Sequence, residues 1–146
     1  MNDAASITLR NATAADAERL AGLLTDEGYP AGTSDLAARI ERFSGAGSRV
    51  VVADAGGEVI GFIAFHVVAR FETDERFVRI VTLVVDPGVR ERGIGRQLLG
   101  EAERVAREEG ATHLEITAGH HRPEARQLYE SLGYDAGVTT YLRKRA

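Results

Sequence analysis

Apolar residues along this chain recur with two spacings, and the spacing changes several times between its two ends. Short, mostly apolar runs bounded by glycine or charged residues predict strands at 7–10, 49–54, 59–68, 77–85, 114–117 and 138–143. Apolar residues three and four positions apart predict helices that begin after Thr13, near Ser34, near Gly93 and at Pro123. The resulting order, β-α-α-β-β-β-α-β-α-β, predicts a mixed α/β fold.

Two connections indicate how the predicted strands pair. Gly56 and Gly57 follow the second strand, and adjacent glycines accept the positive φ that a tight hairpin turn requires. Strands 77–85 and 114–117 flank a helix, so they should run parallel and be joined by a right-handed crossover. We therefore expect a mixed, mostly antiparallel sheet flanked by helices.

Composition narrows the class of protein. The 146 residues predict a single domain, 1–146, that is large enough to bury a core. The net charge of −4 argues against a nucleic-acid partner, and the absence of cysteine excludes disulfides and a cysteine nucleophile. The first residues are too polar for a signal peptide, and no apolar run approaches the roughly 20 residues of a membrane span. We expect a cytoplasmic protein with no membrane partner.

The segment 90–95, Arg-Glu-Arg-Gly-Ile-Gly, carries the clearest candidate chemistry. It follows strand 77–85 and leads into a helical pattern, which places it at a helix N-terminus. The first amides of a helix lack intrahelical partners and the helix dipole adds positive charge there, so such a turn binds anions. Gly93 and Gly95 let a phosphate approach the backbone, and Arg90, Arg92 and Arg96 add cationic charge.

Two familiar phosphate motifs do not fit this segment. The chain contains no Gly-Lys pair, which a P-loop requires. The dinucleotide pattern G-x-G-x-x-G/A fails because Leu98 occupies its last position. Nucleotide binding by the same turn is an alternative of low rank, and it predicts a measurable affinity for ATP or NAD.

The element order and two motifs resemble the GNAT superfamily of acyl-CoA-dependent N-acyltransferases. Arg90, Gly93 and Gly95 match the signature Gln/Arg-x-x-Gly-x-Gly/Ala after the fourth strand. A helix that ends in Tyr-x-x-x-Gly-Phe/Tyr matches Tyr129 through Tyr134. The resemblance covers about 6–143, and it implies a GNAT-like sheet that is splayed between its fourth and fifth strands, usually by a bulge in the fourth.

The resemblance also implies acetyl-CoA as the co-substrate. Family members bind its pyrophosphate through backbone amides of the glycine turn and pair its pantetheine arm with the fourth strand. Leu83 and Val85 match the positions that pair with the arm. The matching pyrophosphate donors are Arg92, Gly93, Ile94, Gly95 and Arg96, beside the signature residue Arg90.

Acyl transfer from a thioester requires a stabilised oxyanion and a proton for the leaving thiolate. The resemblance makes Tyr129 the general acid and the Val85 backbone amide the oxyanion donor. Tyr129 has a second interpretation, because it lies at helical spacing with Ala125, Leu128 and Leu132, as a residue of a buried face does. Both interpretations remain open at the level of sequence.

No general base follows from the sequence. Many family members place a carboxylate on the fourth strand, but strand 77–85 contains none. The alternatives are direct attack by a neutral amine, deprotonation through water, or a base elsewhere in the chain. The candidates for that base are Glu72, Asp74, Glu75, His66 and His120.

Two further positions relate to the acceptor and to metals. Tyr29 lies where family members line the acceptor pocket. His120 and His121 are adjacent, but no further ligand stands at a metal-binding spacing, so no metal is expected.

The expected function is transfer of an acetyl group to a primary amine of a small molecule or a peptide. The alternative is a non-catalytic acyl-CoA sensor on the same fold. Dimers are common in the family, so the resemblance leaves a homodimer open.

Overall fold

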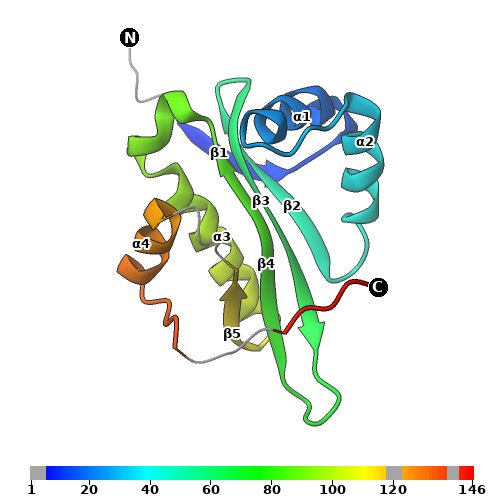
Figure 1. Ribbon diagram of the computed structural model, residues 1–146, viewed down its shortest axis with the longest axis vertical. Coiled ribbons are helices and arrows are strands. Elements are labelled where there is room, and N and C mark those ends of the chain that lie inside the picture. Colours follow the sequence, from blue (N-terminus) through cyan, green and yellow to red (C-terminus); the bar gives the residue numbers. More distant parts are fainter. Residues whose placement is uncertain (1–5, 118–122, 138–141) are drawn as a thin grey trace. The chain divides into compact units, whose positions relative to one another are not determined.

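The computed structural model describes residues 6–117, 123–137 and 142–146, which fall into two compact units divided after Ile116. The first unit holds most of the elements (Figure 1). Its strands are β1 (Ile7–Asn11), β2 (Ser48–Ala55), β3 (Glu58–Ala69), β4 (Arg76–Val85) and β5 (Ala111–Ile116). Its helices are α1 (Ala17–Asp26), α2 (Thr33–Arg42) and α3 (Ile94–Glu108), with short 3-10 helices η1 (Ala14–Asp16) and η2 (Pro87–Arg92). The second unit contains α4 (Pro123–Ser131).

The five described strands form one sheet in the order β1-β2-β3-β4-β5. The pairs β1–β2, β2–β3 and β3–β4 are antiparallel, and β5 runs parallel to β4. This confirms the mixed, mostly antiparallel sheet. The hairpin between β2 and β3 is also as predicted, because Gly56 and Gly57 have φ values of 66° and 103°.

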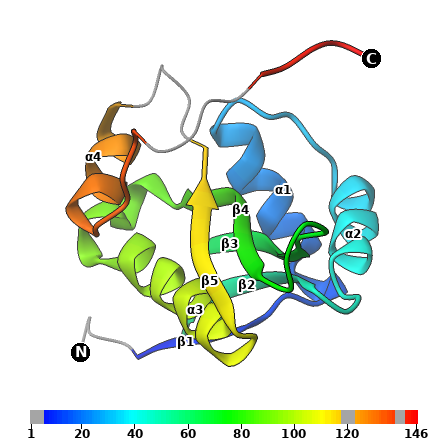
Figure 2. The same ribbon diagram turned by 90° about the horizontal axis from the view of Figure 1, so that it is seen from below.

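Helices cover the sheet on both faces within the first unit. α1 and α2 lie on one face and α3 on the other (Figure 2). Phe62 of β3 and Val84 of β4 are a cross-strand pair, and both belong to the buried cluster under α1 and α2. On the opposite face, Ile94 and Leu98 of α3 are no more than 1% exposed.

Gly61 determines how closely α3 approaches the sheet. A Cβ at this position would lie 3.0 Å from the Val84 carbonyl oxygen and 3.3 Å from Cγ2 of Ile94. It would also lie 3.4 Å from Cδ1 of Leu98. The first turn of α3 therefore packs directly on the backbone of β3 where β3 has no side chain.

Asp16 anchors the start of α1 to the sheet. Asp16 is 6% exposed, and its carboxylate accepts a hydrogen bond of 2.8 Å from the Thr13 backbone N–H, which caps η1. The Arg10 guanidinium donates to both carboxylate oxygens at 2.9 and 3.0 Å and also to Asp54. These hydrogen bonds join β1, η1 and β2.

Two elements, η2 and β5, differ from the sequence-based expectation, and a third expected element cannot be compared. η2 was not predicted, because a short 3-10 helix has no apolar periodicity and depends on a proline in its first turn and on a side-chain cap. β5 begins at Ala111, earlier than predicted, because Ala111 pairs with Arg76 of β4 although the polar residues Thr112 and His113 follow it. The predicted strand 138–143 falls mostly outside the described residues.

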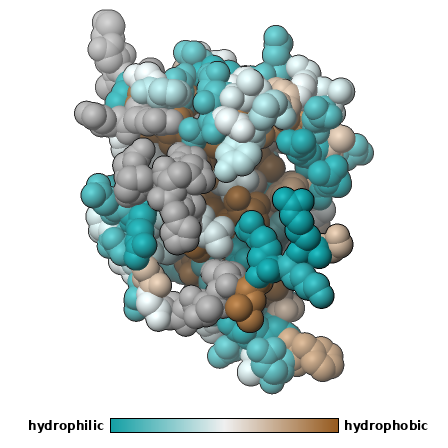
Figure 3. All heavy atoms as spheres, in the orientation of Figure 1, coloured by the Kyte–Doolittle hydropathy of each residue, from teal (hydrophilic) through white to brown (hydrophobic). Residues whose placement is uncertain are grey.

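Polar residues cover most of the face shown in Figure 3, with smaller apolar areas between them. In the part of the chain that the structure describes, no helix combines the length and apolar character needed to cross a bilayer.

Candidate active site

β4 stops pairing with β5 halfway along its length. The parallel pairing ends at Ile80, opposite Ile116. On the other side, Thr82 and Ile80 pair with consecutive residues of β3, so Val81 between them forms a bulge. Beyond the bulge, no strand of the described residues pairs with the outer edge of 81–85. The bulge that the family resemblance implied is present, and the described part of β5 ends opposite Ile80, so the implied splay stays a prediction.

The open edge of β4 carries backbone donors. Asp86, directly after β4, donates its N–H to the Ile60 carbonyl of β3 at 2.8 Å. N–H groups alternate between the two edges of a strand, so those of Val85 and Leu83 point to the open edge. The two residues predicted to pair with an extended ligand therefore present their donors on the side without a strand.

The glycine turn connects this edge to α3. Gly93 has φ of 76° and precedes the first helical residue, Ile94. The first bond of the α3 ladder joins the Gln97 N–H to the Gly93 carbonyl at 3.1 Å. The amides of Ile94, Gly95 and Arg96 precede that bond, where helix geometry supplies no acceptor. The predicted anion site thus has the expected backbone form at the N-terminus of a 15-residue helix.

The side chains of the turn divide into two groups. Ile94 and Gly95 are buried against the sheet, which fixes the orientation of their amides. The side chains of Arg92 and Arg96 are exposed at the turn. The Arg90 side chain lies outside what the structure describes, so its predicted contribution stays a prediction.

Asp86 and Arg19 hold the entrance to the turn, a contact that sequence reasoning missed. Asp86 accepts a hydrogen bond of 2.8 Å from the Gly88 backbone N–H, which caps η2. Its other carboxylate oxygen binds the Arg19 guanidinium, and Arg19 also donates to the Val59 carbonyl at 2.8 Å. Arg19 lies 67 residues earlier, on α1. No local sequence signal joins positions that far apart.

Tyr129 lies in the second unit, near the end of α4. Its carbonyl accepts the Tyr134 backbone N–H at 3.0 Å, and Gly133 N–H binds the Glu130 carbonyl at 3.1 Å. Gly133 has φ of 94°, so these residues form a Schellman C-cap. The rings of Tyr129 and Tyr134 pack at 6.1 Å between centroids. The Tyr-x-x-x-Gly-Tyr motif is therefore a helix terminus in which the tyrosine also packs.

The structure separates the predicted bases by their distance from the bulge. Glu72, Asp74 and Glu75 lie in the loop before β4, at least six residues or about 20 Å along the chain from Val81. Glu72 and Glu75 are 3.3 and 3.9 Å from Arg70. His66 lies closer on β3, with Nδ1 2.9 Å from the Ser48 hydroxyl and its ring against that of Phe43. His120 lies outside the described residues.

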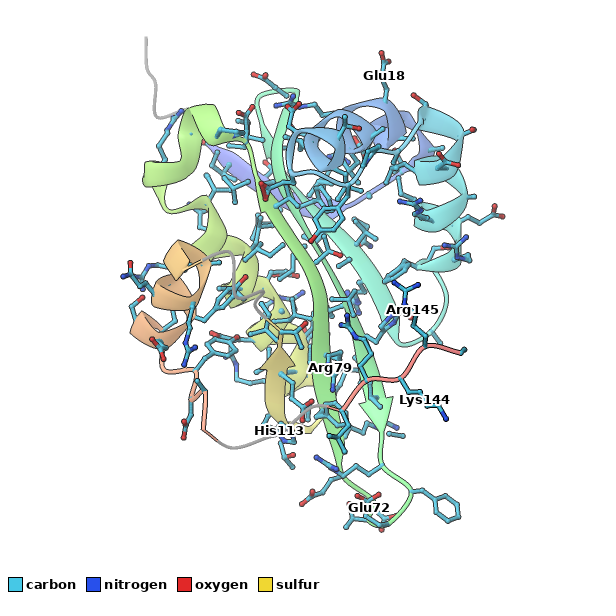
Figure 4. The ribbon with its side chains drawn as sticks, viewed as in Figure 1. Glu18, Glu72, Arg79, His113, Lys144 and Arg145 are labelled. Carbon is cyan, nitrogen blue, oxygen red and sulfur yellow. The ribbon has the colours of Figure 1, made fainter. Side chains whose placement is uncertain are left out.

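A charged cluster beside the splay was also missed by sequence reasoning. Arg79 and Glu115 are cross-strand partners, and Arg79 Nη2 donates to Glu115 Oε1 at 2.7 Å. His113 Nε2 lies 3.0 Å from the other carboxylate oxygen of Glu115. His113 also stacks on Phe77, with ring centroids 5.2 Å apart and planes 2° apart. Figure 4 labels Arg79 and His113 on the neighbouring strands β4 and β5.

Tyr29, the residue expected to line the acceptor pocket, is 56% exposed in the loop between α1 and α2. Among the described residues, no three or more His, Asp or Glu side chains form a metal-binding group.

Residues 16–134, which contain the open strand edge, the glycine turn and the α4 cap, match the model of the acetyltransferase (GNAT) family. The chain belongs to this family. The prediction from the two motifs is thereby confirmed, and the five-stranded sheet agrees with the family fold.

Individual relatives carry N-acetyltransferase names. The chain is 34% identical over 108 residues to the uncharacterized N-acetyltransferase YhfO of Bacillus subtilis. This alignment covers 73% of this chain and 70% of that protein. It is 37% identical over 78 residues to the aminoalkylphosphonate N-acetyltransferase of Salmonella typhimurium. That alignment covers 53% of this chain and 51% of the relative. These names and the family membership support acetyltransferase activity in general terms.

The fold is also similar to that of an aminoglycoside N-acetyltransferase, AAC(6')-Iy, solved in complex with CoA. The TM-score is 0.82 at 20% sequence identity, and the match covers 100% of this chain and 99% of that one. At 20% sequence identity, this similarity shows a shared fold and does not by itself show a shared activity.

Proposed function

We propose that this protein transfers an acetyl group from acetyl-CoA to a primary amine. The observation that carries the proposal is the open edge of β4 over 81–85, which leads directly into the N-terminus of α3. An extended arm with amide groups fits the former, and a pyrophosphate fits the latter. The family membership and the CoA complex of the aminoglycoside enzyme support the same co-substrate.

The direction of the arm follows from the two ends of the site. With the pyrophosphate at the amides of Gly93 to Arg96, the arm runs back along β4 from Val85 toward Val81. The thioester then lies near the bulge, and the Leu83 N–H comes closer to its carbonyl oxygen than the Val85 N–H does. We therefore assign the Val85 N–H, the oxyanion donor expected from sequence, to the arm, and the Leu83 N–H to the oxyanion.

The chemistry needs no covalent intermediate on the protein. A neutral amine attacks the thioester carbonyl carbon, a backbone N–H stabilises the oxyanion, and the C–S bond breaks. The departing thiolate takes a proton, which we assign to the Tyr129 hydroxyl. This assignment rests on the position of Tyr129 in the family motif.

The test combines co-substrate binding with an amine panel. Isothermal titration should give tight binding of acetyl-CoA and CoA and much weaker binding of ATP and NAD. Thiol release should then be followed with 2-aminoethylphosphonate, an aminoglycoside, spermidine and a peptide with a free N-terminus. Turnover of any of these supports the proposal, and ATP or NAD binding as tight as CoA binding contradicts it. CoA binding without turnover on the panel would favour the non-catalytic sensor.

A further inference from the structure

Within the first unit, α1 and α2 cover only part of their face of the sheet, and the remaining part is where an acceptor can approach the bulge. Phe62 lies under these helices, and by the alternation of β3 the His66 side chain is on the same face. The contact of His66 with Phe43, at the end of α2, agrees with this placement. Arg79 is the cross-strand partner of His66, so the Arg79–Glu115 pair lies on this face as well.

The opposite face is closed to an acceptor. Ile80 pairs with Phe65, which by alternation is on the α3 side of the sheet, and both side chains are 0% exposed. Val78 on the same side is also 0% exposed. An amine that reaches a thioester at the bulge must therefore come from the face that carries Glu115. Val81 itself is 45% exposed, as expected for a residue beside an approach route.

Glu115 stands at the point where β4 and β5 separate. Its partner Arg79 is two residues from the bulge at Val81, or about 7 Å along the strand. β4 contains no Asp or Glu, and Glu115 is the one acidic residue of β5. Along these two described strands, Glu115 is therefore the carboxylate closest to the bulge. Its side chain is 19% exposed, so a small ligand can reach it without a change of fold.

The carboxylate is held in place from two sides. Arg79 binds one oxygen at 2.7 Å and His113 approaches the other at 3.0 Å. His113 is itself fixed by its stack on Phe77 and by the Thr112 hydroxyl, 3.0 Å from Nδ1. A carboxylate whose orientation is fixed by hydrogen bonds from Arg79 and His113 is suited to bind a cationic donor at a defined place.

We propose that Glu115 receives the primary ammonium group of the acceptor and takes its proton, with Arg79 and His113 as positioning residues. The inference rests on the proposed acetyl transfer. The ammonium gives one proton through Glu115 to bulk water, and the nitrogen lone pair forms the C–N bond. The tetrahedral intermediate loses its second N–H proton by the same route as the C–S bond breaks, and the thiolate is protonated. The balance is one ammonium and one thioester converted to one amide, one thiol and one released proton.

Glu115→Gln tests the proposal, and Glu109→Gln is its matched control. Glu109 makes a similar surface pair with Arg76, at 3.2 Å, at the end of β4 far from the bulge. In Glu115→Gln we expect kcat/KM for the amine to fall about 100-fold or more at pH 7, with the acetyl-CoA Kd unchanged. The loss should shrink toward pH 9–10, because more of the amine then arrives already neutral. Glu115→Asp should keep part of the rate.

Three results would overturn the proposal. They are a Glu115→Gln rate close to wild type, a loss no larger than that of Glu109→Gln, and a loss that is independent of pH and accompanied by weaker acetyl-CoA binding. If the wild type binds CoA but acetylates no amine, the proposed function fails separately. Calorimetric binding of spermidine to the CoA-loaded protein then decides the role of Glu115. A tenfold weaker affinity in Glu115→Gln supports ammonium binding, and equal affinity contradicts it.

Discussion

The rings of Tyr129 and Tyr134 pack against each other across the C-cap of α4, with centroids 6.1 Å apart. In a Schellman motif these two positions commonly make a hydrophobic contact, and here both are tyrosines. One residue can therefore serve as a helix cap contact through its ring and as an acid through its hydroxyl. The two interpretations of Tyr129 left open by the sequence do not exclude each other.

Tyr129→Phe separates these roles, because phenylalanine keeps the ring and removes only the hydroxyl. If Tyr129 protonates the thiolate, kcat should fall by about 100-fold or more while the Kd of acetyl-CoA and the melting temperature stay close to wild type. Steady-state kinetics, calorimetry and thermal unfolding measure the three quantities. Tyr134→Phe is the control and should leave kcat unchanged. Equal kcat in wild type and Tyr129→Phe would refute the acid role.

Gly93→Ala should weaken acetyl-CoA binding as well as the fold. The φ of 76° at Gly93 costs a residue with a Cβ about 1–2 kcal/mol, and relief of that strain would move the first amides of α3. Gly110→Ala is a matched control, because Gly110 has φ of 72° beyond the other end of the same helix. Both variants should lose similar unfolding free energy in urea titrations. A matching loss of acetyl-CoA affinity in Gly110→Ala would show that helix stability, and not the turn, controls binding.

Gly61→Ala should loosen the contact between α3 and β3. The added Cβ would meet the Val84 carbonyl at 3.0 Å and Ile94 at 3.3 Å, and overpacking of this kind costs about 1–3 kcal/mol. Gly100→Ala, on α3 itself, has no atom within 4 Å of the new Cβ and should gain about 0.5–1 kcal/mol from helix propensity. Denaturant titration of the two variants measures both values. Opposite signs are expected, and destabilisation by both would contradict the packing argument.

The stability of the fold should depend on Asp16 at acidic pH. Hydrogen bonds from Arg10, and then from the Thr13 N–H, hold the pKa of the Asp16 carboxyl below its ordinary value of 3.8, against an opposing effect of burial. A lowered folded-state pKa means that this stabilisation is complete above about pH 5 and is lost as the pH falls through the folded-state pKa. At pH 7, Asp16→Asn should cost about 2 kcal/mol, because charge-assisted hydrogen bonds are removed.

Urea titrations of wild type and Asp16→Asn between pH 7 and pH 3 measure this dependence. The difference in unfolding free energy should narrow as the pH is lowered, since the wild-type carboxyl becomes protonated as well. Glu18→Gln is the control, because Glu18 points away from the protein on α1 (Figure 4). A difference that stays constant across this pH range would assign the effect of Asp16→Asn to packing.

The backbone of the proposed acetyl-CoA site was largely predictable from local sequence. The apolar run of β4, the two glycines at 93 and 95 and the periodic residues of α3 are adjacent in the chain, and each has a short-range physical effect. The long-range contacts beside the candidate site were not predictable in the same way. Arg79 and Glu115 are 36 residues apart, and Arg19 and Asp86 are 67 apart, so their contacts depend on strand register and helix packing.

The sequence by itself determined the order of the elements, the hairpin at Gly56 and Gly57, and the anion-binding form of the turn at Gly93. These features follow from backbone conformations that neighbouring residues impose on one another. The tertiary structure alone decided that the bulge of β4 falls at Val81, that no strand of the described residues pairs with its outer edge beyond Ile80, and that the β5 carboxylate Glu115 is paired with Arg79. A bulge and a register are settled by competition among many long-range pairings, and no short stretch of residues encodes the outcome.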